Sequence, residues 1–289
     1  MSEKRTAVIT DSNSGIFAKE AKEKGIFVVP MPVVLDMNSF YEGVDITHKE
    51  LCEHLSKGLP ASTSQPSPAD VTGAWEEAFK AGYDEVVYIP MSSSLSSSYE
   101  TAAALAQEYE GRVFVADNRR VSVTLRHSVE DAIRCRDNGA GAEEICRRLE
   151  ESAGDSLIFI GVETLKYLKA NGRVTPAGAA IGTLLGIRPL LVIEGGKLDA
   201  YAKVRGTKKC MEREIAALRE YYDTVPKEGK RIRISAAGSY ADPKNADIWH
   251  AMVQDAFPEE NVDYDPLTLS ISCHVGLDSF GVGMSLLPE

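Results

Sequence analysis

The sequence predicts an α/β protein of two domains, with a parallel βαβ domain over residues 1–154 and a mixed α/β domain over residues 155–289. The length of 289 residues supports two domains, because one domain usually holds roughly 100–200 residues. Short apolar runs alternate with helix-forming segments in the first half, an order typical of parallel strands joined by helices. A β-hairpin pattern in the second half adds antiparallel pairing.

Composition and charge argue against several classes of partner. Apolar residues at 44% and charged residues at 26% are ordinary for a globular protein. Asp and Glu (43) outnumber Lys and Arg (32), and the net charge of −11 disfavours binding to nucleic acid or to an anionic membrane. No apolar leader precedes the first strand, and no run of about 18 apolar residues occurs. We therefore expect a cytoplasmic protein without membrane insertion and with transient membrane contact at most.

Cysteine usage and motifs argue against a metal or a cofactor. The five cysteines are scattered and lack C-x-x-C spacing, which favours reduced thiols over disulfides or a zinc site. The sequence also lacks a P-loop, a G-x-G-x-x-G motif and a His, Cys or carboxylate cluster at metal-binding spacing. We expect no cofactor and no metal.

The first half of the chain alternates strands and helices. The apolar run 6–10 predicts a buried strand that ends in a polar turn. Thr10, Asp11 and Ser12 are site candidates there, because ligands gather beyond the carboxyl ends of parallel strands, although a capping role is the simpler interpretation for Asp11. A helix at 18–24 and an apolar strand at 25–34 follow, and the polar span 36–45 then indicates a loop or hairpin. Further helices are expected at 47–57, 71–81, 124–136 and 142–152, and further strands at 86–89 and 112–116.

Two hydroxyl-rich loops in this half lead into helices. Three prolines within residues 59–70 exclude regular structure ahead of the helix at 71–81. Six serines between Ser92 and Ser98 follow the strand at 86–89 and precede an Ala-rich helix. A helix start offers unpaired N–H groups and the positive end of the helix dipole, so the two loops together could bind a carboxylate or phosphate. The alternative, that the serines only cap a helix, stays open.

The second half begins after residues 153–155 with an apolar strand at 157–162. A hairpin is expected from strands at 189–193 and 198–204, joined by a turn at 194–197 that contains two glycines. The other expected elements are helices at 163–170, 176–185, 208–222 and 245–257 and strands at 231–236 and 267–272.

Several short motifs occur in an order and at a spacing typical of one protein family. They are Thr10-Asp11-Ser12, Thr63-Ser64-Gln65-Pro66-Ser67, the serine loop from Ser92 to Tyr99, Asp117, Asn171-Gly172-Arg173 and the basic run from Lys203 to Lys209. With these motifs the chain resembles the DegV family over essentially its whole length. The resemblance implies a two-domain DegV-like fold with a ligand site between the domains. It also implies a non-catalytic bacterial lipid carrier, which binds one long-chain fatty acid and presents its carboxyl group to a separate fatty acid kinase.

The resemblance further implies which residues form the head-group site. Hydroxyl groups of the two loops would hold the fatty-acid carboxylate, and these are Ser62, Thr63, Ser92, Ser93 and Ser96. Arg205 and His274 would lie near the mouth of the site, with Arg173 as a third candidate. The sequence departs from the family pattern at Ser94 and Ser97, where glycine is usual, and at Leu277, Asp278 and Ser279.

Two other functions compete with the lipid carrier. A serine hydrolase could use Ser93 as nucleophile and His274 as base, with Asp278 orienting the histidine, although the G-x-S-x-G motif is absent. A DegV-like protein that has lost or changed its ligand is the second alternative. The carrier has a physical basis as well, because each buried CH₂ group contributes about 0.8 kcal/mol to the binding of an acyl chain. The residues that would line an acyl tunnel cannot be told from ordinary core residues in the sequence.

Overall fold

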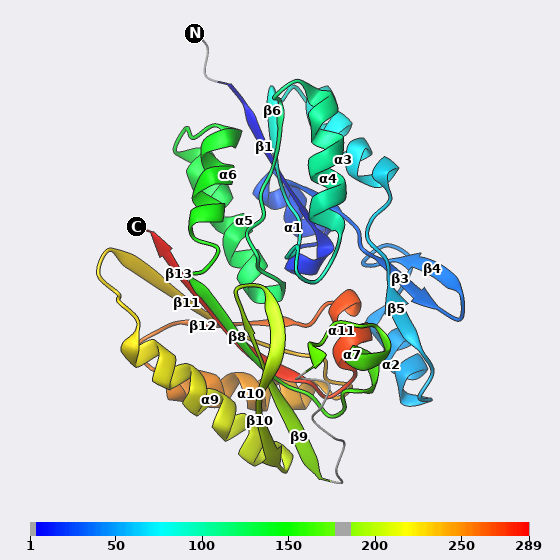
Figure 1. Ribbon diagram of the computed structural model, residues 1–289, viewed down its shortest axis with the longest axis vertical. Helices are drawn as coiled ribbons and strands as arrows, with labels where there is room; N and C mark the ends of the chain where they lie inside the picture. The colour runs from blue at the N-terminus through cyan, green and yellow to red at the C-terminus, as the bar shows by residue number, and fades with distance from the viewer. Residues whose placement is uncertain (1–3, 177–185, 289) are drawn as a thin grey trace.

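The computed structural model describes residues 4–176 and 186–288, and it confirms an α/β fold with three β-sheets in that part of the chain (Figure 1). A four-stranded parallel sheet lies in the upper part of the view, and a six-stranded mixed sheet lies in the lower part. A small antiparallel sheet stands beside them. The helix expected at 176–185 falls almost entirely outside the described residues.

The parallel sheet has the strand order β2-β1-β6-β7. Its strands are β1 (Thr6–Asp11), β2 (Phe27–Val29), β6 (Glu85–Ile89) and β7 (Val113–Val115). The helices of this region are η1 (Ser12–Ser14), α1 (Ala18–Lys24), α3 (Pro68–Lys80), α4 (Ser98–Ala106), η2 (Gln107–Tyr109), α5 (Ser122–Asp137) and α6 (Ala142–Glu151).

Helices cover both faces of the parallel sheet, which is why β1 and β6 read as continuous apolar runs. Val8 and Val87 pack with residues of α1, α5 and α6 on one face. Ile9 and Tyr88 pack with residues of α3 and α4 on the other, where Trp75 meets Tyr88 edge to face. The carboxyl edge of this sheet carries the turn after β1, the serine loop and the start of α5.

The small sheet has the order β4-β3-β5 and is antiparallel. Its strands are β3 (Pro32–Leu35), β4 (Asn38–Tyr41) and β5 (Ala61–Thr63), and α2 (His48–Ser56) connects β4 to β5. Val33, Leu51 and Ala61 pack against Tyr167 of α7 (Lys166–Ala170) and Cys273 of α11 (Leu269–Val275). This contact joins segments of the chain that are more than one hundred positions apart.

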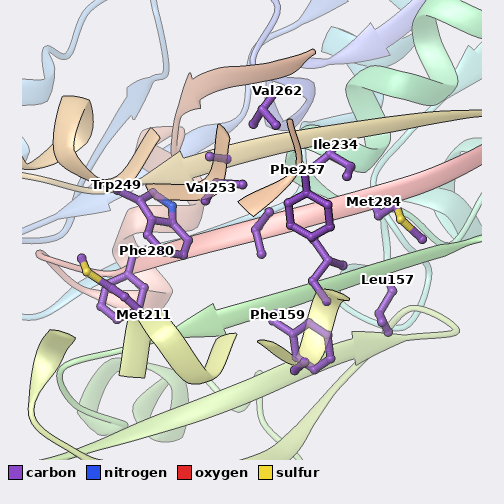
Figure 2. Packing of buried hydrophobic residues seen from close by; sticks show 14 of the residues in the cluster. Leu157, Phe159, Met211, Ile234, Trp249, Val253, Phe257, Val262, Phe280 and Met284 are labelled. Carbon is purple, nitrogen blue, oxygen red and sulfur yellow. The ribbon is translucent and has the colours of Figure 1, made fainter. Parts of the chain in front are cut away.

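The six-stranded sheet has the order β10-β9-β8-β13-β11-β12. Its strands are β8 (Ser156–Gly161), β9 (Ile187–Glu194), β10 (Lys197–Arg205), β11 (Lys230–Gly238), β12 (Val262–Pro266) and β13 (Phe280–Pro288). Helices α9 (Thr207–Thr224) and α10 (Pro243–Ala256) cover one face. The core on that face includes Trp249, whose ring lies 5.3 Å from that of Phe280, together with Met211 and Phe159 (Figure 2).

The opposite face of the six-stranded sheet turns toward the rest of the molecule. Helix α5 packs against β1 and also against β11 and β13. Where α5 crosses β13, a Cβ atom on Gly283 would lie 2.7 Å from Cγ2 of Val123, so glycine allows the helix to approach. The division of the chain at residue 154 stays a prediction.

The structure corrects three of the expected elements. The strand at 25–34 is two strands in different sheets, because Pro30 and Pro32 cannot donate backbone hydrogen bonds to a continuous ladder. Residues 59–70 do contain regular structure, since β5 is an edge strand before Pro66 and Pro68 occupies the first turn of α3, where proline is tolerated. The strand expected at 267–272 is wrong, and α11 lies there instead. Strands β12 and β13 were not expected.

Candidate functional site

A cavity lies where the carboxyl edge of the parallel sheet, the inner face of the six-stranded sheet and helix α11 meet. It encloses about 880 Å³ of space between atoms, counting its open mouth. The two sheets contribute side chains of β8, β9, β11 and β13 and of the loops after β1, β6 and β7. Residues from distant parts of the chain therefore form one site.

Most of the cavity wall is apolar. The aliphatic and methionine side chains in it are Met31, Met91, Leu95, Val121, Val123, Ile158, Ile160, Leu168, Ile193, Leu198, Ala237, Leu267, Ile271, Val275 and Val282. Gly281 and Gly283 of β13 also line the cavity. Such a wall suits the burial of a hydrocarbon chain.

Polar side chains gather around one contact between β5 and α11. The Oγ1 atom of Thr63 lies 2.8 Å from Nε2 of His274, and both residues line the cavity. Arg173 also lines it and donates from Nε to the carbonyl of Leu95 at 3.0 Å. Ser96 completes this group and shares a hydrogen bond of 2.8 Å with Ser98. We call Thr63, Ser96, Arg173 and His274 the head-group cluster.

His274 is neutral at physiological pH. Burial lowers the pKa of its imidazole to about 4, and the nearby positive charge of Arg173 lowers it further. Its Nδ1 atom is buried and has no hydrogen-bond partner among the described residues. One ring nitrogen is thus engaged by Thr63, and the other is unpaired among the described residues.

The other residues implied by the resemblance do not line the cavity. Ser62 precedes Thr63 on β5, and neighbouring residues of a strand point to opposite faces. The hydroxyl of Ser92 donates to the carbonyl of Gly196 at 3.3 Å, and that of Ser93 donates to Oδ2 of Asp117 at 2.8 Å. Arg205 is exposed at the end of β10.

These contacts bear on the hydrolase alternative. The hydroxyl of Ser93 is bound to Asp117, and the imidazole of His274 is bound to Thr63. The candidate nucleophile and its candidate base therefore have different partners and do not form the hydrogen-bonded pair that a hydrolase needs.

A buried carboxylate network lies beside the cavity, and the sequence did not reveal it. Glu42 accepts hydrogen bonds from the hydroxyl of Ser12 at 2.6 Å and from the backbone N–H of Ser270 at 3.0 Å. Asp11 accepts from the backbone N–H groups of Met91 and Asn13. Burial raises the pKa of Asp11 to about 7 and outweighs these hydrogen bonds, which lower it. Glu42 is 228 positions from Ser270, so no local pattern could have paired them.

Two groups of features are absent from the part of the chain that the structure describes. No cluster of three His, Cys, Asp or Glu residues there could hold a metal ion. No helix there has both the length and the apolar character needed to cross a membrane.

The fold and the site define an α/β protein with a mostly apolar cavity and a polar cluster in its wall. A model of the DegV family, whose description calls its members uncharacterised, matches residues 5–286. The chain belongs to the DegV family. A DegV domain-containing protein of Deinococcus radiodurans is 30% identical over 283 residues, which cover 97% of this chain and 98% of that protein.

Solved structures of DegV proteins have a similar fold. The fold is similar to that of a DegV family protein of Thermus thermophilus described as binding fatty acid, with a TM-score of 0.87, 29% identity and coverage of 98% of this chain and 100% of that chain. It is also similar to a DegV lipid-binding protein of Thermotoga maritima, with a TM-score of 0.82, 27% identity and coverage of 99% of both chains.

Proposed function

We propose that this protein binds one long-chain fatty acid, with the acyl chain in the apolar cavity and the carboxylate at the head-group cluster, and that it is a carrier without catalytic activity of its own. The observation that carries the proposal is the combination of a mostly apolar wall with Thr63, Arg173 and His274 in the same cavity. The fatty-acid binding described for the Thermus thermophilus relative supports the choice of ligand.

The chemistry of the cluster suits a carboxylate. The Thr63 hydroxyl and the neutral imidazole of His274 share one hydrogen bond, so one of the two keeps a hydrogen to donate to a carboxylate, and the guanidinium of Arg173 adds a positive charge. The acyl chain supplies most of the binding free energy, because each buried CH₂ contributes about 0.8 kcal/mol. The polar groups then fix which end of the ligand faces the mouth.

The first test is the content of the purified protein. Native mass spectrometry followed by lipid extraction should find one fatty acid per chain, acquired from the expression host. A protein that carries no fatty acid and takes up none from solution would contradict the proposal.

A pair of neighbouring variants tests the head group. Thr63→Val keeps the shape of the side chain and removes its hydroxyl, and a lost hydrogen bond to a charged group costs about 1.5–3 kcal/mol. We expect the Kd for a fatty acid, measured by displacement of a fluorescent analogue, to rise about tenfold or more. Ser62→Ala is the matched control, because Ser62 does not line the cavity, and its Kd should stay within about twofold. Equal effects of the two variants would refute the placement.

The carrier would present its ligand to a separate fatty acid kinase in the cytoplasm, as the family resemblance implies. Arg205 is exposed and lies outside the cavity, so it suits a contact with the kinase or with the phosphate being transferred. We expect Arg205→Ala to keep its bound fatty acid while acyl-phosphate formation with a cognate kinase and ATP slows. Loss of the bound fatty acid in this variant would make Arg205 a ligand anchor instead.

A further inference from the structure

A second group of polar residues interrupts the apolar wall of the cavity. It consists of Asn13 in the turn after β1, Ser122 at the start of α5 and Ser270 in the first turn of α11. Ser270 and His274 are four positions apart on one face of α11, so about 6 Å of helix separates this group from the head-group cluster. We call Asn13, Ser122 and Ser270 the inner polar group.

Hydrogen bonds fix the positions of the inner polar group. The Asn13 side chain donates from Nδ2 to Oγ of Ser270 at 3.3 Å and accepts at Oδ1 from the backbone N–H of Ser122 at 3.3 Å. The hydroxyl of Ser270 in turn donates to buried Glu42 at 3.1 Å. Ser122 is held at a φ of 55°, which non-glycine residues rarely adopt, so its surroundings determine where its side chain lies.

The group keeps hydrogen-bonding capacity that the described residues do not use. The Ser122 hydroxyl lines the cavity and makes no hydrogen bond to another described residue. The Asn13 amide has two N–H groups, and its one hydrogen bond as donor goes to Ser270. A saturated acyl chain laid against these groups would take them out of water without satisfying them, which costs free energy.

We infer that the inner polar group recognises a hydroxyl substituent on the acyl chain, so that the preferred ligand is a hydroxylated fatty acid. A hydroxyl both donates and accepts, and it can therefore accept from the Asn13 N–H while it shares a hydrogen bond with Ser122. This inference rests on the proposed function, because it assumes that an acyl chain occupies the cavity.

Matched ligands test the inference directly. Stearic acid and a series of monohydroxystearic acids, which differ in the position of the hydroxyl, would each displace a fluorescent fatty acid from the delipidated protein. One or two neighbouring positions of the hydroxyl should bind about two- to tenfold more tightly than stearic acid, as one added hydrogen bond allows. The remaining positions should bind less tightly than stearic acid, because they bury an unpaired hydroxyl.

Variants of Ser122 then assign the preference to the inner polar group. Ser122→Ala and Ser122→Gly both remove the hydroxyl, and glycine accepts the positive φ without strain, so at least one variant should fold. In each, the affinity ratio of the preferred hydroxy acid to stearic acid should fall toward one. Ser94→Ala is the control, because Ser94 is exposed and lies outside the cavity, and it should keep the wild-type ratio.

The outcomes separate this inference from the proposed function. If stearic acid binds and no hydroxy acid binds more tightly, the inner polar group holds only water, and the inference is overturned while the carrier function stands. A preference that survives in both Ser122 variants also overturns it. If no fatty acid of either kind binds, the proposed function itself fails.

Discussion

Glu214 on α9 is a carboxyl group inside a hydrophobic core. Its side chain has 0% exposure, and its neighbours on the same helix, Cys210 and Leu218, belong to the core cluster under the six-stranded sheet. Burial raises the pKa of the carboxyl well above its usual value of 4.5, although the backbone amides of Gly161 and Val282 oppose this effect. The carboxyl therefore holds its proton more tightly in the folded protein than in the unfolded chain.

This difference makes stability depend on pH in a predictable direction. Above pH 4.5 the unfolded chain loses the Glu214 proton and the folded protein keeps it, so the folded state binds more protons and stability falls as pH rises. Glu214→Gln should remove that part of the fall. The unfolding free energy of the variant minus that of the wild type should therefore be larger at about pH 8 than at about pH 4, by roughly 1.4 kcal/mol or more. Urea unfolding at both pH values measures it.

The exposed Glu212 of the same helix gives the control. Glu212→Gln should change the unfolding free energy by the same small amount at both pH values. If Glu214→Gln behaves like this control, the Glu214 carboxyl is ionised in the folded protein and is hydrated despite its burial.

At the scale of elements, α11 depends on Glu42, the residue that follows strand β4. Glu42 accepts from both the backbone N–H and the hydroxyl of Ser270, and so it fixes the first turn of a seven-residue helix. The same helix carries Ile271, His274 and Val275 into the cavity wall. A helix this short has little stability of its own and relies on such contacts.

We expect Glu42→Ala to lower the unfolding free energy by about 2–5 kcal/mol, because it leaves buried donors of Ser12 and Ser270 without an acceptor. Hydrogen exchange should speed up in α11 more than in α10, which lies on the far face of the six-stranded sheet. Glu42→Gln keeps one acceptor oxygen and should have a smaller effect. Uniform acceleration over both helices would mean that Glu42 supports the whole fold and not α11 in particular.

Local patterns predicted most elements and failed where tertiary contacts decide. Helix α1 lies at the expected residues, and the hairpin of β9 and β10 has the expected turn with two glycines. Residues 267–272 alternate apolar and hydroxyl side chains, a period that predicts a strand, yet both kinds of side chain are buried there. The hydroxyl groups find partners in Glu42 and in neighbouring residues, and so a helix is possible at this place.

The site was predictable only in part, for a related reason. The hydroxyl-rich loops do contribute Thr63 and Ser96 to the cavity. Asn13 and Ser270 were not expected there, because they are 257 positions apart and meet only through the fold. The apolar wall could not be recognised either, since Ile158 or Ala237 would look the same in a solid core.

At the scale of the whole molecule, the cavity is where the separate sheets meet. A ligand in it would contact the loops of the parallel sheet, the inner face of the six-stranded sheet and α11 at once. A ligand that binds only the folded protein stabilises it, by about 2.7 kcal/mol at a concentration one hundred times its Kd. For a chain of this size we expect the Tm to rise by about 5 °C on addition of a fatty acid.

Filling the cavity from the sheet should abolish that rise. Ala237 of β11 is 3% exposed and lines the cavity, so Ala237→Leu would place a larger side chain in the space of the acyl chain. The Tm of this variant should respond little to fatty acid, and its bound lipid after purification should fall. Ala170→Leu adds the same atoms at the exposed end of α7 and should keep the full response. A full response in Ala237→Leu would mean that the ligand stabilises the protein from a place other than this cavity.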